Sequence, residues 1–368
     1  MSQKLVVIGA GEFQLPLILK AKELGYEVHA FAWEEGAVAK DACDYFYPIS
    51  ITEYKSILRQ CRMIEPCGVV SIGSDLASPT VCYVSEMLGL TSNSFEVARC
   101  CTNKYRMRQL FSDAGLDVPY FKLVHTISDV DPDQIPYPVI VKPTDRSGSR
   151  GITKVVCKEQ LEAAIVESVS HSFDKYAIIE GYIPGNEYSC ECISFRGEHH
   201  FLAFTKKFTT GAPHYIETGH IQPCDIDEEA QVRIKEYIFK ALTVLGIQNG
   251  ASHTEFKISE TGDFGIIEIG ARMGGDCIGS DLVPLSTGYD FMKMVIDVAC
   301  GNAPEIRPTV PAYPVARIQF LFTEEDLQTL ENLRQTDPDS LYRVSDICME
   351  NLGNTTDSSS RLGYYITV

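Results

Sequence analysis

Apolar and polar residues alternate in blocks along the first ninety residues, in a pattern typical of strands followed by helices. Apolar runs predict three strands, at residues 4–11, 27–33 and 68–74. Between the first two, Leu17, Ala21 and Leu24 recur at helical spacing, and residues 52–64 predict a second helix. Strands that alternate with helices favour a parallel sheet. We therefore expect an α/β domain with a doubly wound parallel sheet at residues 1–92.

The pattern changes near residue 93, where we place a domain boundary. Residues 103–115 predict a helix that ends at Gly115. Further strands are predicted at 137–142, 152–156, 251–258, 264–272, 315–322 and 362–368, two strands around a Pro-Gly turn at 176–195, and further helices at 158–168, 228–246 and 324–333. Strands and helices mixed in this way indicate an α+β region after the first domain.

Composition narrows the class of partner. The formal net charge is −18, and no block rich in Lys or Arg is visible, so nucleic acid is not expected as a partner. No apolar run reaches the length of a membrane helix, and the N-terminus has no signal-peptide pattern. The thirteen cysteines lack paired C-x-x-C spacing. We expect reduced thiols in a cytoplasmic protein that has neither a membrane nor a nucleic acid as partner.

The stretch VIGAGEFQLP, residues 7–16, partly matches a dinucleotide-binding fingerprint. That motif requires G-x-G-x-x-G, but Gln14 occupies the position of the third glycine after Gly9 and Gly11. Acidic residues in range of a ribose are available at Glu34 and Glu35. The segment is compatible with a tight strand-to-helix turn, which we favour, or with a nucleotide-binding oxidoreductase.

Two carboxylates are predicted to face each other on a hairpin. If ETGD, residues 260–263, is the loop, Glu255 lies directly opposite Glu268. Alternation then places the following side chains on one face of the hairpin: His253, Glu255, Lys257, Ile266, Glu268, Gly270 and Arg272. Opposed carboxylates can share a proton, bind a cation or remain solvated, and Mg²⁺ prefers such oxygen ligands.

The remaining parts of a phosphate site are found upstream. Lys142 ends an apolar strand and can act as a point charge on phosphate. The loop RSGSRG, residues 146–151, can close its backbone N–H groups over phosphate oxygens, or can be an ordinary hairpin loop. The chain has no P-loop motif and no kinase H-R-D motif.

In combination, these segments resemble the ATP-grasp superfamily of carboxylate–amine ligases, including the L-amino-acid ligases. The segments that carry the resemblance are NKYRMRQ, VIVKP, SGSRG, IIEGYIPGNEYS, HTEFK and IIEIGAR, in the family's order. The resemblance implies a two-lobed ATP-grasp fold at residues 93–310, with a small lobe over about 118–182 and a large lobe over about 183–310. Residues 311–368 would complete or cap this lobe.

The resemblance also implies roles for individual residues. Lys104 and Lys142 match the lysines that contact ATP phosphates, and Ser147, Gly148 and Ser149 belong to the loop over them. Glu255 and Glu268 match the Mg²⁺ ligands, and Arg272 matches the catalytic arginine that steadies the transferring phosphoryl group together with Lys142. For the nucleotide, the matches are Glu180, Tyr182 and Ile183 at adenine and Glu187 at ribose.

One position near the expected metal site departs from the family's pattern. Gly270 stands where many members have a metal-binding Asn, which leaves open whether one or two Mg²⁺ ions bind, with Mn²⁺ as a substitute.

HYIETGH resembles a segment near the substrate in amino-acid ligases, so we expect substrate contacts from His214, Glu217 and His220, and from Gly274 and Gly275 beside Arg272. The spacing of three between His214, Glu217 and His220 suits a helical face or a convergent loop.

The resemblance implies an ATP-dependent ligase that joins a small carboxylate to an amine through an acyl phosphate. The substrates are expected to be amino-acid-like, and a homodimer is compatible with the family. A single-unit enzyme resembling carbamoyl-phosphate synthetase, which would activate bicarbonate or carbamate, is one alternative. A non-catalytic ATP-binding protein is another.

Overall fold

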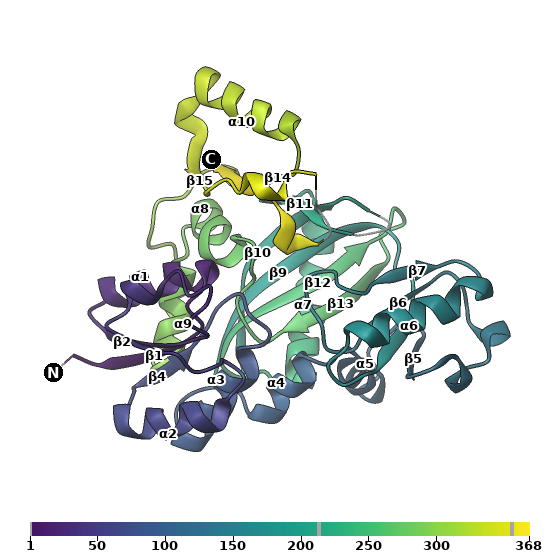
Figure 1. The fold of residues 1–368 in the computed structure, drawn as a ribbon, viewed down its shortest axis with the longest axis horizontal. Coiled ribbons are helices and arrows are strands. Elements are labelled where there is room, and N and C mark those ends of the chain that lie inside the picture. The colour runs from purple at the N-terminus through teal and green to yellow at the C-terminus, as the bar shows by residue number, and fades with distance from the viewer. Residues whose placement is uncertain (1, 212–214, 354–356) are drawn as a thin grey trace.

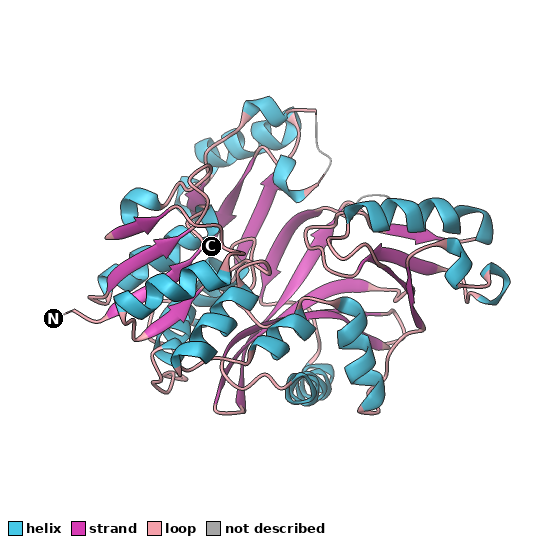
Figure 2. Ribbon diagram, turned by 60° about the horizontal axis from the view of Figure 1, so that its bottom comes forward, coloured by secondary structure: helices cyan, strands magenta, loops and turns pink. Residues whose placement is uncertain are grey.

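Three separate sheets organise the chain in the computed structural model, which describes residues 2–211, 215–353 and 357–368 (Figure 1). One is a parallel sheet of four strands near the N-terminus, and the others are antiparallel sheets of four and eight strands. The large sheet lies between the two smaller ones (Figures 1 and 2). Within the described residues, no helix combines the length and apolar character that crossing a membrane requires.

The N-terminal sheet confirms the predicted parallel α/β unit. Its strand order is β3-β2-β1-β4. The strands are β1 (Lys4–Ile8), β2 (Glu27–Phe31), β3 (Tyr45–Tyr47) and β4 (Gly68–Val70), with helices α1 (Leu15–Glu23), α2 (Tyr54–Ile64) and α3 (Ser78–Leu88). Strand β3 and helix α3 were not predicted; β3 has only three residues, which is too short for an alternating pattern to show.

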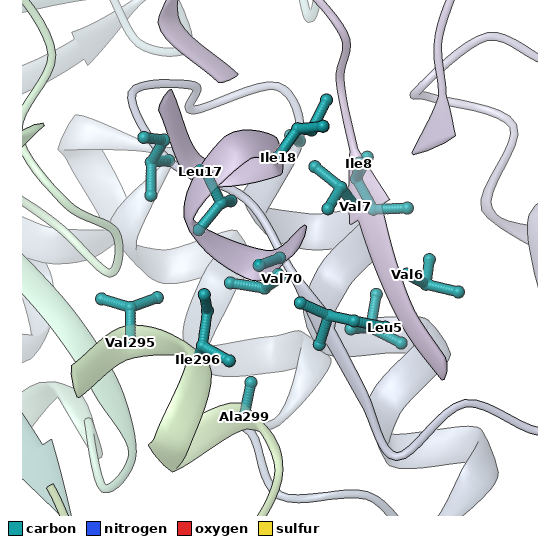
Figure 3. Packing of buried hydrophobic residues seen from close by; sticks show 14 of the residues in the cluster. Leu5, Val6, Val7, Ile8, Leu17, Ile18, Val70, Val295, Ile296 and Ala299 are labelled. Carbon is teal, nitrogen blue, oxygen red and sulfur yellow. The ribbon is translucent and has the colours of Figure 1, made fainter. Parts of the chain in front are cut away.

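A helix from late in the sequence completes the core of this first unit. Helix α9 (Phe291–Ala299) packs against α1 and β4, so that Val295 and Ile296 lie among side chains of residues 5–70 (Figure 3). The ion pair between Lys20 and Asp290, 3.1 Å apart, fastens the start of α9 to α1. The N-terminal unit is therefore not formed by residues 1–92 alone, and the predicted domain boundaries stay a prediction.

The smaller antiparallel sheet carries the predicted phosphate loop. Its order is β5-β8-β6-β7, with β5 (Phe121–Val124), β6 (Val139–Pro143), β7 (Thr153–Val155) and β8 (Ala177–Gly181), and α6 (Leu161–His171) packs on it. Helices α4 (Phe95–Cys101) and α5 (Lys104–Asp113) precede it, and the side chains of Ser94 and Asn103 cap their N-termini. The loop 146–151 connects β6 to β7.

The eight-stranded sheet joins the middle of the chain to its C-terminal segment. Its order is β13-β12-β9-β10-β11-β14-β16-β15. The strands are β9 (Asn186–Phe195), β10 (Glu198–Thr209), β11 (Glu217–Gln222), β12 (Gly250–Ile258), β13 (Phe264–Gly270), β14 (Ala316–Leu321), β15 (Leu341–Val344) and β16 (Gly363–Thr367). The remaining α-helices of the described residues are α7 (Glu228–Leu245), α8 (Val283–Thr287) and α10 (Glu324–Thr336).

The glycines of the opening stretch form a strand-to-helix turn. Gly9 has a φ of +104°, and a Cβ atom there would lie 2.9 Å from the Gln14 side chain. Gln14 accepts a hydrogen bond from the Gly11 N–H and donates one to the carbonyl oxygen of Ile72. The residue at the position of the third fingerprint glycine thus fills and fastens the turn, as the structural interpretation requires.

The predicted hairpin forms, but its register contains a bulge. Glu255 lies opposite Glu268, as expected, whereas Phe256 pairs with Ile266, so Ile267 is an extra residue on β13. The prediction that Ile266 shares the face of Glu268 is therefore wrong, because Ile266 is buried with Phe256 in the core.

Candidate functional site

A cleft of about 410 Å³ lies where the three sheets approach one another. It contains side chains from β6, β8, β9, β10, β11, β12 and β13, from the start of α5, and from loops of the N-terminal unit. Most of the predicted site residues line it: Lys104, Lys142, Ser147, Gly148, Ser149, Glu180, Tyr182, Ile183, Glu187, Glu217, His220, Glu255, Glu268, Arg272 and Gly275. The fold thus brings together residues that are up to 171 positions apart in the sequence (104 to 275).

One end of the cleft is built on a buried group of three charges. The Glu180 carboxylate lies 2.6 Å from Arg108 Nε and 2.6 Å from Lys142 Nζ. Arg108 also donates from Nη2 to the carbonyl oxygens of Ile266 and Ile267, which the bulge presents side by side. Glu180 is only 4% exposed, so it does not lie in an exposed turn.

Burial and neighbouring charges act in opposite directions on this group. Desolvation alone would raise the pKa of Glu180, but Arg108 and Lys142 hold it below its ordinary value. For Lys142, burial prevails over the attraction of Glu180, and its pKa is lowered. The group therefore combines an ionised carboxylate with a lysine whose charged form is disfavoured by burial.

The opposed carboxylates Glu255 and Glu268 each hold an ammonium group. Glu255 Oε1 lies 2.5 Å from Lys207 Nζ, and Glu268 Oε2 lies 2.7 Å from Lys104 Nζ. Burial would raise the pKa of Glu255, but Lys207 and His253 hold it well below its ordinary value. Each of the two opposed carboxylates is thus paired with its own lysine, and the cation-binding alternative for the hairpin stays a prediction.

Lys207 is a residue that the sequence analysis missed. It lies on β10 directly opposite Glu187 on β9, and its Nζ is 3.2 Å from Glu187 and 3.8 Å from Glu217 as well as in contact with Glu255. Desolvation alone would lower its pKa, but the three carboxylates raise it well above its ordinary value. Alternation along β10 offered a signal, because one of the adjacent Lys206 and Lys207 must face inward.

Arg272 is oriented by a residue from the N-terminal unit. Its Nε and Nη2 donate to the two carboxylate oxygens of Asp75, at 2.7 and 2.9 Å, in a bidentate pair. A Cβ atom at Gly270 would lie 3.4 Å from both Arg272 Nε and Asp75 Oδ1, so a larger side chain there would press on this pair. Asp75 follows β4 in a loop and carried no sequence signal.

A buried pair of His253 and Glu191 joins the hairpin to the neighbouring strand β9. His253 Nδ1 pairs with Glu191, which lies opposite it on β9, and His253 Nε2 is 3.3 Å from Glu255. Burial would lower the pKa of His253, but Glu191 and Glu255 raise it to about 9. The other Glu191 oxygen accepts the Gly274 N–H at 3.0 Å. Gly274 therefore packs behind the cleft, whereas Gly275 lines it.

The loop 146–151 approaches the cleft from the small sheet. Ser149 has a φ of +58° and donates from its hydroxyl to the Tyr215 carbonyl oxygen, 3.0 Å away. Lys104 Nζ donates to the Arg146 carbonyl oxygen at 2.8 Å. On the far side, the Tyr182 N–H donates to the Pro138 carbonyl oxygen at 3.1 Å, so this N–H is already bonded within the protein.

The last four residues of the expected substrate segment, 217–220, form part of a strand and not a helical face or a loop. His214 lies outside the described residues, and Glu217 and His220 lie on β11. Strand residues three apart normally face opposite sides, but an irregularity at Thr218 in the pairing with β10 turns both into the cleft. His220 is wholly buried, and burial lowers its pKa.

Comparisons with known proteins agree with this geometry. Residues 135–281 match the family model described as "ATP-grasp domain". The chain is similar to alanine–anticapsin ligase of Bacillus subtilis (strain 168), at 29% identity over 296 residues that cover 71% of this chain and 62% of the relative. It is 31% identical over 192 residues to D-alanine–D-alanine ligase B of Chromobacterium violaceum, covering 50% of this chain and 61% of the relative.

Among solved structures, L-amino acid ligase from Bacillus licheniformis superposes with a TM-score of 0.83 at 25% identity, covering 100% of this chain and 93% of that chain. The chain spans about three fifths of the length of the two curated relatives just described.

Proposed function

Because this chain belongs to the ATP-grasp superfamily, we propose that it is an ATP-dependent ligase that joins the carboxylate of an amino-acid-like substrate to an amine. The observation that carries the proposal is the opposed pair Glu255 and Glu268, held between Lys104 and Lys207 in one cleft. Its relatives named above, two carboxylate–amine ligases and an L-amino acid ligase, support the same class of reaction.

The residues fit the magnesium ion that this family uses. Glu255 and Glu268 supply hard oxygen donors on opposed positions, and Mg²⁺ commonly takes one or two carboxylates together with substrate phosphates. Within the described part of the chain, no three His, Cys, Asp or Glu side chains form a ready metal cluster. A metal held here would therefore share its coordination with ATP, and when bound it would neutralise charge on the phosphates.

The cations of the cleft would position and neutralise the triphosphate. Lys142 has a depressed pKa beside Glu180, so an approaching phosphate would stabilise its charged form. Lys104 reaches the same region from the start of α5 and is joined to the loop 146–151 through Arg146. Positioning and charge neutralisation are the main contributions that phosphoryl transfer requires of a protein.

The proposed reaction has two steps. A substrate carboxylate oxygen attacks the γ-phosphorus, and the bond between the γ-phosphorus and the oxygen that bridges it to the β-phosphate breaks. ADP departs, and the substrate becomes an acyl phosphate. The amine nitrogen then attacks the acyl carbon, inorganic phosphate leaves, and the nitrogen loses a proton. Arg272, fixed by Asp75, would hold the phosphoryl oxygens through both steps, and the loop 146–151 would keep water from the acyl phosphate.

Phosphate release from ATP and Mg²⁺ tests the proposal, measured across pooled amino acids and small carboxylates. We expect one pool to stimulate release, and Glu268→Gln to abolish that stimulation. Stimulation by bicarbonate alone would instead favour the carbamoyl-phosphate type of enzyme. ATP binding without stimulation by any pool would contradict the ligase.

A further inference from the structure

Two thiols from distant parts of the sequence meet where the N-terminal unit joins the rest of the chain. Cys67 lies directly before β4 and Cys300 directly after α9, and their Sγ atoms are 3.3 Å apart across 233 positions of sequence. Both side chains are partly exposed, and both lie outside the set of described residues that line the cleft. The pair is therefore separate from the candidate site and in contact with solvent.

The residue that follows Cys67 has no side chain, and this lets the end of α9 come close to β4. A Cβ atom at Gly68 would lie 2.8 Å from the Ala299 carbonyl oxygen and 3.2 Å from Cys300 Sγ. On the strand side, the Cys67 N–H donates to the Lys4 carbonyl oxygen at 2.9 Å, and Cys67 Sγ lies 3.2 Å from the same oxygen. The backbone thus holds one thiol in place while the helix end brings the other to it.

The two thiols differ in how readily they ionise. A hydrogen bond with Cys300 lowers the pKa of Cys67 although burial opposes this, and the same contact, together with burial, raises the pKa of Cys300. The thiolate is the nucleophile in exchange with disulfides. Cys67 is therefore the thiol that reacts first, and Cys300 lies where it can attack the sulfur of a modified Cys67.

We propose that Cys67 and Cys300 form a reversible dithiol–disulfide site, which reacts with low-molecular-weight disulfides and ties α9 to β4 when it is oxidised. A disulfide bond is about 2.05 Å long, so the sulfur atoms would move about 1.2 Å closer, a displacement that rotation of the two side chains produces. The site does not depend on the proposed ligase reaction.

A second cysteine pair provides an internal comparison. Cys190 and Cys192 lie on β9 with their Sγ atoms 3.6 Å apart, and both are 0% exposed. Burial raises the pKa of Cys190 well above its ordinary value and keeps a dissolved reagent away from both sulfur atoms. Proximity is thus similar in the two pairs, whereas exposure differs, so Cys190 and Cys192 should stay reduced under conditions that oxidise Cys67 and Cys300.

Glutathione disulfide serves as the oxidant in the proposed reaction. The Cys67 thiolate attacks one of its sulfur atoms, the S–S bond of glutathione disulfide breaks, and one glutathione leaves as a thiolate. Cys300 then loses its proton and attacks Cys67 Sγ, which forms the Cys67–Cys300 bond and releases the second glutathione. Two cysteine thiols are oxidised, one glutathione disulfide is reduced to two thiols, and the protons lost by the cysteines pass to the two glutathione thiolates.

The cross-link would fasten the N-terminal sheet to the large sheet. Helix α9 packs on α1 and β4 of the N-terminal unit and also on β9 and β12 of the eight-stranded sheet (Figure 3 shows its side facing the N-terminal unit). The loop after β4 carries Asp75, the partner of Arg272. A bond between residues 233 positions apart also restricts the unfolded chain, which stabilises the folded state.

Peptide mapping of the folded wild type at defined ratios of reduced to oxidised glutathione tests the proposal. Free thiols would be trapped by acid and then alkylated in denaturant, and linked peptides identified by mass spectrometry. We expect a peptide that joins Cys67 to Cys300 and disappears with dithiothreitol, while Cys190 and Cys192 are recovered alkylated. Failure to find this peptide at any ratio, or a mixed disulfide with glutathione that persists at Cys67, would overturn the proposal.

Thermal unfolding separates the cross-link from oxidation elsewhere. The oxidised wild type should unfold at least about 3 °C above the reduced form. Cys67→Ser and Cys300→Ser should each abolish this rise. Cys43→Ser is the matched control, because Cys43 is another partly exposed thiol of the N-terminal unit, bonded to the Lys40 carbonyl oxygen, and it should keep the rise.

Two results of these thermal measurements would contradict the proposal. A rise that persists in both Cys67→Ser and Cys300→Ser would show that other thiols cause it. A cross-linked wild type whose midpoint is unchanged or lower would show that the bond does not fasten α9 to β4. If either serine variant fails to fold, the wild-type peptides and the wild-type midpoint still decide the outcome.

Discussion

Removing the carboxylate of Glu180 should destabilise the protein strongly, because it leaves two buried cations without a counter-charge. Glu180→Gln keeps the shape of the side chain and removes only its charge. At an effective dielectric constant of about 20, each of its 2.6 Å contacts with Arg108 and Lys142 corresponds to about 6 kcal/mol of attraction. Much of this offsets desolvation, and breaking a buried pair costs about 3–5 kcal/mol. We expect a loss of that size in the free energy of unfolding.

Urea denaturation followed by circular dichroism measures this loss. The matched control is Lys158→Gln, since Lys158 and Asp133 form an ion pair of similar length, 2.7 Å, between side chains that are 53% and 71% exposed. The control should leave the free energy of unfolding unchanged within error.

A double-mutant cycle keeps the test decisive if Glu180→Gln unfolds. Lys142→Met in the Glu180→Gln background removes one of the two stranded cations, so the double variant should be less destabilised than the sum of the single changes by at least about 1 kcal/mol. Additive effects, or a loss for Glu180→Gln no greater than that of the control, would show that the buried charges are not coupled as the distances indicate.

Three further outcomes follow from the site. Mg²⁺ should be required for adenylyl imidodiphosphate to raise the thermal midpoint, and Glu268→Gln should remove most of that rise; an equal rise in EDTA would contradict the metal site. Asp75→Asn should cost about 2 kcal/mol at pH 7, since charged hydrogen bonds to Arg272 are lost. Burial would raise the pKa of Asp75, but Arg272 holds it below its ordinary value, so the stabilisation that Asp75 contributes is present above about pH 4 and is lost as the pH falls through the depressed pKa. Urea titrations at pH 7, 5 and 3.5 should show the difference in free energy of unfolding between the wild type and Asp75→Asn narrowing only at the lowest pH. Gly274→Ala would place a Cβ atom 2.8 Å from His253 Nδ1, and a loss of about 1–3 kcal/mol in thermal or urea unfolding is expected, whereas an unchanged variant would show that this packing is loose.

Local patterns predicted much of the fold. Apolar runs and helical spacing located β1, β2, β4 and the helices α1 and α2, because these elements depend on residues close together in sequence. The same patterns could not show that α9, more than two hundred residues later, covers β4. Apolar helices look alike in sequence whichever sheet they cover, since the hydrophobic effect has no direction.

Some features of the candidate site could likewise be predicted from the sequence, and others could not. Glu255 and Glu268 were found from the hairpin because the pairing of adjacent strands follows from loop position, although the predicted alignment near the loop was one residue out. Direct opposition holds at 255 and 268 only because the bulge at Ile267 restores it. The bulge also presents the two carbonyl groups that bind Arg108, which no period-two pattern contains.

By itself, then, the sequence determined many of the strands and helices and the residue types that can hold phosphate, because these depend on short-range periodicity and on side-chain chemistry. Only the tertiary structure decided which charges meet. Lys207 faces three carboxylates, Asp75 fixes Arg272, and Arg361 holds Glu217 across 144 positions of sequence. Charged side chains are ordinarily solvated, and what makes them a site is burial against partners from distant elements, which is a property of the assembled sheets.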